Sequence, residues 1–160
     1  MDSRELRNAL GRFPTGVAVV ATRDAEGSLV GLTINSVATV AIAPARLLWS
    51  LGTRSRNREA FEAAPYFTVN VLEEGQVALA RQMSAAIPDR FAGIPWRAAP
   101  ASGLPFLAGC IATFECRRSS VAEIGDHIVF VGDIASFEEH PGEPLLYDAG
   151  RYSRLQKEAA

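Results

Sequence analysis

The stretch Tyr66-Phe67-Thr68-Val69-Asn70-Val71-Leu72 carries the clearest structural signal in the chain. From Phe67 to Val71, apolar residues fall at every second position and polar residues occupy the positions between them. Side chains alternate between the two faces of a β-strand, so this period of two predicts a half-buried strand. A sheet is therefore expected around it.

Apolar and β-branched runs on both sides of this strand predict further strands. They cover residues 17–22, a strand that starts near 29, and residues 37–42, 47–51, 110–117, 127–137 and 145–147. Pro44 divides the third of these from the fourth, because proline suits a turn and not a central strand. Short helices are expected at residues 3–10, with Ser3 as a cap, at 55–64, with Ser55 as a possible cap, and at 76–83.

Four prolines within residues 87–109 predict a long loop region, with Phe91 and Trp96 packed into it. About seven strands with short turns between them, and two or three short helices, predict an antiparallel β-barrel with helical additions. A parallel βαβ sheet is the weaker interpretation, because consecutive strands lack crossover helices.

Length and composition narrow the class of protein. The 160 residues favour one domain over residues 1–160. The 16 Lys and Arg residues against 18 Asp and Glu give a net charge of -2, which argues against a nucleic-acid binder that relies on bulk positive charge. No apolar run approaches the ~18 residues of a membrane span, and the charged start of the chain lacks a signal-peptide core. A cytoplasmic domain without nucleic-acid or membrane partners is expected.

The two cysteines, Cys110 and Cys116, are too few for a disulfide scaffold. Their spacing is not that of a metal site, so we expect small buried core residues and no metal. The sequence also shows no candidate for a hydrolytic triad.

An arginine-rich segment, Gly52-Thr53-Arg54-Ser55-Arg56-Asn57-Arg58, follows a predicted strand and opens a predicted helix. Guanidinium groups, hydroxyl groups and free N–H groups together suit an anion such as a phosphate. A solvated helix start capped by Ser55 explains the same residues equally well. The glycines of a P-loop or a dinucleotide fingerprint are absent.

Three more segments place polar side chains at the ends of predicted strands. Thr33, Asn35 and Ser36 interrupt an apolar stretch, where they suit either a bound heterocycle or, more simply, a tight turn. His127 follows Gly125-Asp126 at a strand start, where a hydrogen-bonded strand-end histidine is the simpler interpretation. Residues 150–152, Gly-Arg-Tyr, suit either the binding of a planar anionic ligand or the attachment of the C-terminal tail to the body of the protein.

Taken in order, these segments resemble the flavin reductase-like family, the small reductase components of two-component flavin monooxygenases. The resemblance runs from residue 6 to residue 155 and rests on the order and spacing of its motifs. These are Phe13-Pro14-Thr15-Gly16-Val17, Gly31-Leu32-Thr33-Ile34-Asn35-Ser36, Phe67-Thr68-Val69-Asn70-Val71-Leu72, Asp89-Arg90-Phe91, Gly125-Asp126-His127, Pro144-Leu145-Leu146-Tyr147 and Gly150-Arg151-Tyr152. The sequence departs from the family in two places: at Val37, where phenylalanine is common, and in Thr39-Val40-Ala41, which stands in place of Ser-Val-Ser.

The resemblance implies a flavin-binding split β-barrel that works as a homodimer. It also implies that NADH or NADPH reduces FMN or FAD by hydride transfer from nicotinamide C4 to flavin N5. The reduced flavin would then pass to a partner flavin-dependent monooxygenase. The cofactors carry this chemistry, which fits a chain without a protein nucleophile.

The resemblance also implies roles for particular residues. Those beside the flavin ring would be Thr33, Asn35 and Ser36. The segment after the next strand would hold the phosphate end, through Thr53, Ser55, Arg56 and Asn57. Also among the cofactor-binding residues would be Val37, Ser50 and Leu51. His127 would lie where the nicotinamide stacks and is the catalytic candidate. Near the ligands would lie Arg90, Phe91, Arg151 and Tyr152.

Three other functions remain open on the sequence, because one fold hosts many functions. A flavin-storage protein would hold flavin without oxidising NADH. An enzyme like pyridoxamine-phosphate oxidase would consume an amine and need no nicotinamide. A flavin-free interaction domain would use the polar segments only as turns and caps.

Overall fold

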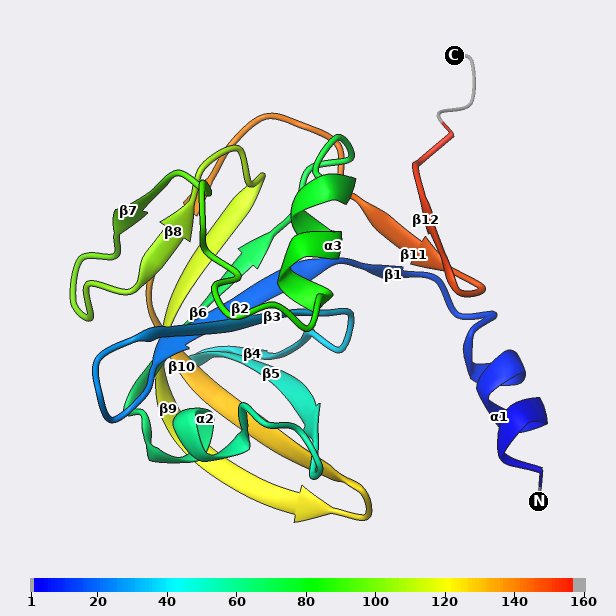
Figure 1. Cartoon of the computed structure of the whole chain (residues 1–160), viewed down its shortest axis with the longest axis horizontal. Coiled ribbons are helices and arrows are strands. Elements are labelled where there is room, and N and C mark those ends of the chain that lie inside the picture. The colour runs from blue at the N-terminus through cyan, green and yellow to red at the C-terminus, as the bar shows by residue number, and fades with distance from the viewer. Residues whose placement is uncertain (1, 157–160) are drawn as a thin grey trace.

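A seven-stranded antiparallel sheet forms the body of the molecule (Figure 1). The computed structural model describes residues 2–156, so the expected domain limits at 1 and 160 lie outside it. Strand order in the sheet is β3-β2-β6-β9-β10-β5-β4. The strands are β2 (Ala18–Arg23), β3 (Leu29–Ile34), β4 (Ala38–Ile42), β5 (Ala45–Gly52), β6 (Tyr66–Val71), β9 (Ala112–Ile124) and β10 (His127–Glu139).

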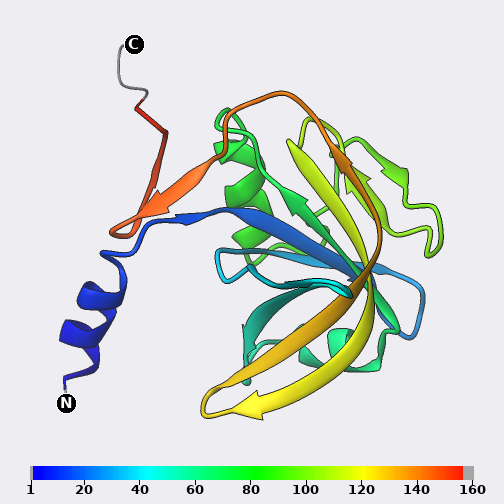
Figure 2. The same ribbon diagram turned by 180° about the vertical axis from the view of Figure 1, so that it is seen from behind.

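The sheet closes on itself. Strands β3 and β4 are its two outer strands, yet only the segment Asn35–Val37 joins them. Four Cα-to-Cα steps reach at most ~14 Å, so the two edges of the sheet must lie close together. We call Asn35–Val37 the seam segment. The mainly β, antiparallel barrel expected from the sequence is confirmed, and the strands in Figures 1 and 2 curve accordingly.

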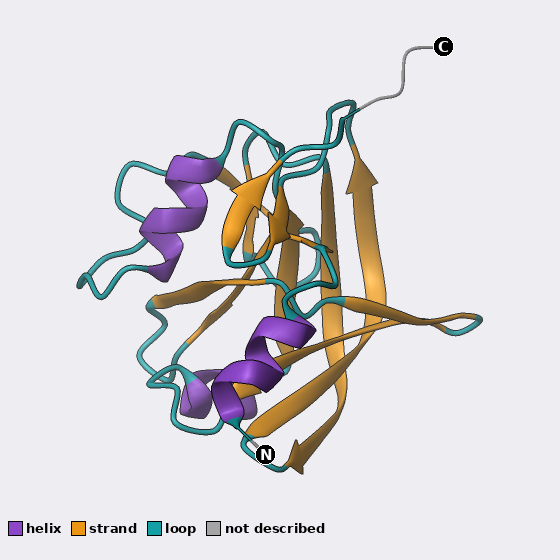
Figure 3. Cartoon of the chain, turned by 90° about the vertical axis from the view of Figure 1, so that its right-hand side faces the viewer, coloured by secondary structure: helices purple, strands orange, loops and turns teal. Residues whose placement is uncertain are grey.

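A second, small sheet lies on one side of the barrel, with both termini (Figures 1 and 2). It pairs β1 (Thr15–Gly16) with β11 (Leu146–Asp148), and β11 with β12 (Arg151–Ser153). Helix α1 (Ser3–Leu10) lies on the same side, faces the viewer in Figure 3, and has no buried residue. Its cap is Asp2, whose Oδ1 accepts from the Arg4 N–H at 2.7 Å, and not Ser3 as expected.

The other two helices are α2 (Arg58–Ala63) and α3 (Val77–Ser84). Helix α2 begins three residues later than predicted. The Ser55 N–H donates to the Gly52 carbonyl oxygen at 2.9 Å, and the Ser55 hydroxyl accepts from the Asn57 N–H at 3.2 Å. These bonds form a turn before the helix. Within residues 2–156, no helix is both long and apolar enough to cross a membrane.

Strand β6 differs from its prediction because both of its faces are buried. The expected loop region contains two short paired strands, β7 (Trp96–Ala98) and β8 (Pro105–Leu107), and β8 covers the polar face of β6. The Thr68 hydroxyl donates to the Pro105 carbonyl oxygen at 2.9 Å, and Asn70 Oδ1 accepts from the Leu107 N–H at 2.8 Å. The loop therefore supplies partners that water would otherwise supply. Trp96 is 38% exposed and does not pack as expected.

Two apolar clusters form the core. One fills the barrel, where Trp49 stacks on Phe130 with ring centroids 4.6 Å apart, and contains Cys116. The other packs α3 against β2 and contains Cys110, Met83 and Phe91. Both cysteines are buried and free, and burial raises the pKa of each thiol to about 12. They are inert core residues, as expected.

Candidate functional site

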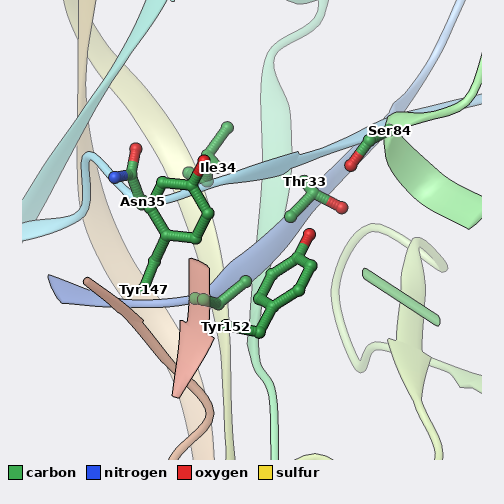
Figure 4. Close-up of a pocket in the computed structure, with 7 residues that line it drawn as sticks. Thr33, Ile34, Asn35, Ser84, Tyr147 and Tyr152 are labelled. Carbon is green, nitrogen blue, oxygen red and sulfur yellow. The ribbon is translucent and has the colours of Figure 1, made fainter. Parts of the chain in front are cut away.

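A cavity of about 210 Å³ opens where β3 meets the seam segment. We call it the Thr33 cavity. Its lining combines the end of β3, the end of α3 and the small sheet, and consists of Val17, Thr33, Ile34, Asn35, Ser84, Tyr147 and Tyr152. Figure 4 shows six of these side chains with labels. The Tyr147 and Tyr152 rings meet edge to face with centroids 5.6 Å apart.

Hydrogen bonds fix two polar groups of this cavity and leave a third available. The Thr33 hydroxyl donates to the Ala80 carbonyl oxygen at 2.7 Å, and the Ser84 hydroxyl donates to the same oxygen at 2.6 Å. The Asn35 side-chain amide has no hydrogen bond to any residue that the structure describes. Two aromatic rings, aliphatic walls and a free amide suit a planar heterocycle with carbonyl and ring-nitrogen groups.

The rest of the seam segment is structural. The Ser36 hydroxyl donates to the Ser50 carbonyl oxygen at 3.1 Å and accepts from the Ser50 N–H at 3.0 Å. Val37 packs against the barrel cluster, and Leu51 is part of it. These four residues position the cavity without lining it.

A second cavity, of about 240 Å³, lies farther along β3. We call it the Arg90 cavity. Four sequence-predicted site residues line it: Arg56, Asn57, Arg90 and Phe91. Arg90 is fixed in place, since its Nε donates to the Ala85 carbonyl oxygen and its Nη1 to the Gly31 carbonyl oxygen, both at 2.8 Å.

Positive charge in the Arg90 cavity is not neutralised by an ion pair. Burial lowers the pKa of Arg90, and the nearby Arg56 charge lowers it further. Neither guanidinium forms an ion pair within residues 2–156. Asp24 also lines the cavity but forms no ion pair with either guanidinium, so two cations and one carboxylate leave a net positive charge that suits an anion.

Phe91 forms the wall of this cavity and belongs to the core. A Cβ added to Gly31 would lie 2.7 Å from Phe91 Cζ and 2.7 Å from Met83 Cε. The ring thus packs directly on the β3 backbone, which requires glycine at position 31.

The turn before β10 brings a third group of predicted residues together. His127 lies opposite Gly52 in the β5–β10 ladder, and the Thr53 N–H donates to the Asp126 carbonyl oxygen at 2.9 Å. His127 Nδ1 is 2.8 Å from Asp126 Oδ1, and this hydrogen bond, with the histidine's charge, lowers the pKa of Asp126. The expected strand-end hydrogen bond of His127 is present.

The predicted residues therefore do not all meet at one cavity. His127 is 54% exposed and, like Thr53, Ser55 and Arg151, lines neither the Thr33 cavity nor the Arg90 cavity. Sequence reasoning missed four lining residues of the Thr33 cavity: Val17, Ile34, Ser84 and Tyr147. The hairpin turn at Gly150, which has a positive φ of 82°, could have indicated Tyr147, because a tight turn places it opposite Tyr152. Among the described residues, no cluster of three or more His, Cys, Asp or Glu could hold a metal ion.

Comparison with known proteins identifies this architecture. The family model for the flavin reductase like domain matches residues 10–156. The FMN reductase (NADH) SmoA of Agrobacterium fabrum is 35% identical over 157 residues, which are 98% of this chain and 88% of SmoA. The stachydrine N-demethylase reductase subunit Stc3 of Rhizobium meliloti is 37% identical over 151 residues, 94% of this chain and 65% of Stc3.

A solved structure agrees with these relatives. The NADH:FAD oxidoreductase SgcE6 of Streptomyces globisporus, in complex with NAD and FAD fragments, superposes with a TM-score of 0.93 at 34% identity. The alignment covers 99% of this chain and 96% of that one. The chain spans only about half (48%) of the length of another Rhizobium meliloti relative, 38% identical to it. By its sequence and its fold, the chain belongs to the flavin reductase-like domain family.

Proposed function

We propose that this chain is an NAD(P)H-dependent flavin reductase that transfers hydride from NADH or NADPH to FMN or FAD. The observation that carries the proposal is the pair of cavities along β3. One offers aromatic walls and a free amide, and the other offers two guanidinium groups that form no ion pair with the described residues, beside the single carboxylate of Asp24. A flavin nucleotide has the matching groups, a planar heterocycle and a phosphate.

The chain's own residues would bind and orient the reactants. Thr33, Asn35 and Tyr152 would hold the ring, while Arg56, Asn57 and Arg90 would hold the phosphate end. When bound, flavin and nicotinamide supply the hydride-transfer chemistry, so the protein needs to contribute only position and electrostatics. Ser36, Val37, Ser50 and Leu51 would keep the ring cavity in shape.

His127 would orient the nicotinamide from the barrel rim. Its Nδ1 is engaged by Asp126, which leaves Nε2 for a ligand. Arg151 is exposed in β12, next to Tyr152, and would assist at the edge of the site. The loop histidine His140 is a poorer candidate, because its Nε2 lies 3.4 Å from Glu138 Oε2 and is not left for a ligand.

A homodimer would complete the site. At about 210 Å³ the Thr33 cavity is smaller than the ~300–1,000 Å³ of typical ligand pockets, so one protomer encloses little of a flavin. Large apolar side chains close in sequence to the cavity residues are exposed to solvent. The exposed fraction is 78% for Phe13 and 83% for Ile42. A second copy of the chain would cover such residues.

The reduced flavin would serve a partner flavin-dependent monooxygenase. A relative from Rhodococcus jostii, 37% identical over 157 residues, is named as the reductase subunit HsaB of a flavin-dependent monooxygenase, which supports this part of the proposal. A cytoplasmic location fits the two free cysteines. The test is NADH and NADPH oxidation by purified protein with added FMN, FAD or riboflavin. We expect turnover that depends on flavin. A yellow protein without turnover would instead favour flavin storage, and amine consumption without nicotinamide would favour an oxidase.

A further inference from the structure

A third cavity, with a volume of about 360 Å³, lies against the end of β2 and the turn that follows it, residues 22–25. We call it the Tyr66 cavity. None of the sequence-predicted site residues lines it. Its apolar wall combines the end of α2 with the loop before β8, and includes Ala63, Ala64, Pro65, Tyr66, Ala101 and Leu104.

The Tyr66 cavity adjoins the Arg90 cavity at one shared residue, and helix α2 runs between them. Asp24 lines both of them. Helix α2 connects them as well, since Asn57 before the helix lines the Arg90 cavity and Ala63 at its end lines the Tyr66 cavity. Six residues of helix rise about 9 Å, a distance that one nucleoside unit can bridge.

Asp24 places a hydrogen-bond acceptor between the two cavities. Its Oδ1 accepts from the Ser28 N–H at 2.8 Å and the Glu26 N–H at 3.1 Å. The other oxygen, Oδ2, has no hydrogen-bond partner among the described residues. A carboxylate repels phosphate but accepts hydrogen bonds from ribose hydroxyl groups, as in many nucleotide sites.

The Tyr66 cavity has the properties of a base-binding slot. The polar groups at its edge are already satisfied, because the Thr22 hydroxyl donates to the Tyr66 carbonyl oxygen and the Ser102 hydroxyl donates to Glu115. Arg23 lines it too and is held by its Nη1 bond to the Gly27 carbonyl oxygen at 2.8 Å. Aromatic and guanidinium faces beside small apolar groups are surfaces on which purines stack.

We infer that the Tyr66 cavity binds an adenylate group, the AMP half of FAD, and that the protein therefore prefers FAD to FMN. The order of features along the molecule is the Thr33 cavity, the arginine pair, Asp24 and the Tyr66 cavity. This is the order of ring, phosphates, ribose and adenine in FAD. The inference rests on the proposed function, and NADH carries an adenylate group as well, so the experiment must separate the two.

The experiment compares the binding of FAD and FMN to wild type, Ala63→Phe and Asp24→Asn by calorimetry, without nicotinamide. Ala63→Phe fills the cavity from an exposed helix position. Asp24→Asn keeps the Oδ1 acceptor of the hairpin but removes the charge. Ala122→Phe is the matched control, since Ala122 is exposed on β9 and lines none of the three cavities.

We expect FAD to bind wild type about tenfold more tightly than FMN, and Ala63→Phe to remove that difference while FMN affinity stays within about twofold. Asp24→Asn should weaken FAD binding, because the proposed acceptor for the ribose loses its charge. FMN binding should stay equal or become tighter, because a negative charge near the arginine pair is lost. Equal FAD and FMN affinities in wild type, or the same effect from Ala63→Phe and Ala122→Phe, would overturn the inference.

Two further readouts distinguish the competing explanations. If Ala63→Phe leaves FAD affinity unchanged but raises the KM for NADH with FMN as acceptor, the FAD assignment is wrong and the adenylate belongs to the nicotinamide nucleotide. If wild type binds flavins but oxidises neither NADH nor NADPH with them, the proposed function fails. The binding titrations decide the subsite in either case, because they need no turnover.

Discussion

Ser36 and Ser50 close the barrel through one side chain. The Ser36 hydroxyl donates to the Ser50 carbonyl oxygen and accepts from the Ser50 N–H, at 3.1 and 3.0 Å. Strand β4 leaves β5 at this point, so the hydroxyl takes the place of a ladder partner for the β5 backbone. The same contact fixes Asn35 at the mouth of the Thr33 cavity, one residue before Ser36.

Replacing Ser36 with alanine should cost about 1–3 kcal/mol of unfolding free energy, because two backbone groups of Ser50 lose their partner. Flavin affinity should fall as well, since the seam segment is released. Thermal denaturation and a flavin titration measure the two effects. Ser119→Ala is the control, as its hydroxyl also donates to a backbone carbonyl oxygen, that of Val131, but is exposed. A Ser36→Ala protein no less stable than this control would contradict the structural role.

Replacing Arg56 with alanine should lower the affinity for FMN by about 10- to 100-fold, which is the range for the loss of a hydrogen bond to a charged group. Riboflavin, which has no phosphate, should bind almost as before. Fluorescence titration of both ligands checks this. The control is Arg54→Ala, an exposed neighbour that lines neither the Thr33 nor the Arg90 cavity. Equal losses of affinity for FMN and riboflavin would show that Arg56 does not bind the phosphate.

Replacing His127 with alanine should slow hydride transfer by about tenfold or more through lost orientation, with little change in flavin affinity. Stopped-flow measurements at saturating flavin separate the two quantities. His140→Ala, in the exposed loop after β10, is the matched variant. A hydride-transfer rate that His127→Ala leaves unchanged would exclude His127 from the site.

Glu115 is buried in β9 and anchors the loop between β7 and β8. Its carboxylate accepts from the Ser102 N–H and hydroxyl, both at 2.6 Å, and from the Ser136 hydroxyl at 2.8 Å. Burial opposes its ionisation, but bonds from Ser102, Ser136 and Ala101 outweigh burial and lower the pKa of Glu115. The ionised carboxylate therefore stabilises the fold.

A lowered pKa in the folded state means that this stabilisation is present above the unfolded-state pKa of about 4.3 and is lost as pH falls through the folded value. Glu115→Gln should cost about 1.5–3 kcal/mol at neutral pH, and its melting temperature should decline less in acid than that of wild type. Melting curves across the acid range test this. Parallel declines for both proteins would show that Glu115 does not cause the pH dependence.

Local patterns predicted most of the strands but not how their faces are covered. The alternation in residues 66–72 correctly indicated β6, and Pro44 correctly divided β4 from β5. The same alternation wrongly indicated a solvent-facing side for β6. Thr68 and Asn70 are buried under β8, whose residues lie more than thirty positions later in the chain. A period of two shows which face of a strand is polar, but it does not show whether that face is exposed to solvent. A polar face can be buried if its hydrogen bonds are satisfied.

The amino-acid sequence by itself determined the antiparallel barrel class, the family resemblance and the residue types at the candidate site. These depend on short-range features such as strand periodicity, turn residues and motif spacing. Only the tertiary structure decided which of those residues meet. Arg56 and Arg90 face one cavity because the Arg90 side chain reaches back to the Gly31 carbonyl oxygen on β3. Ser36 became a structural residue because the closing sheet brought it to Ser50. Such encounters follow from how distant segments pack, and no local pattern encodes them.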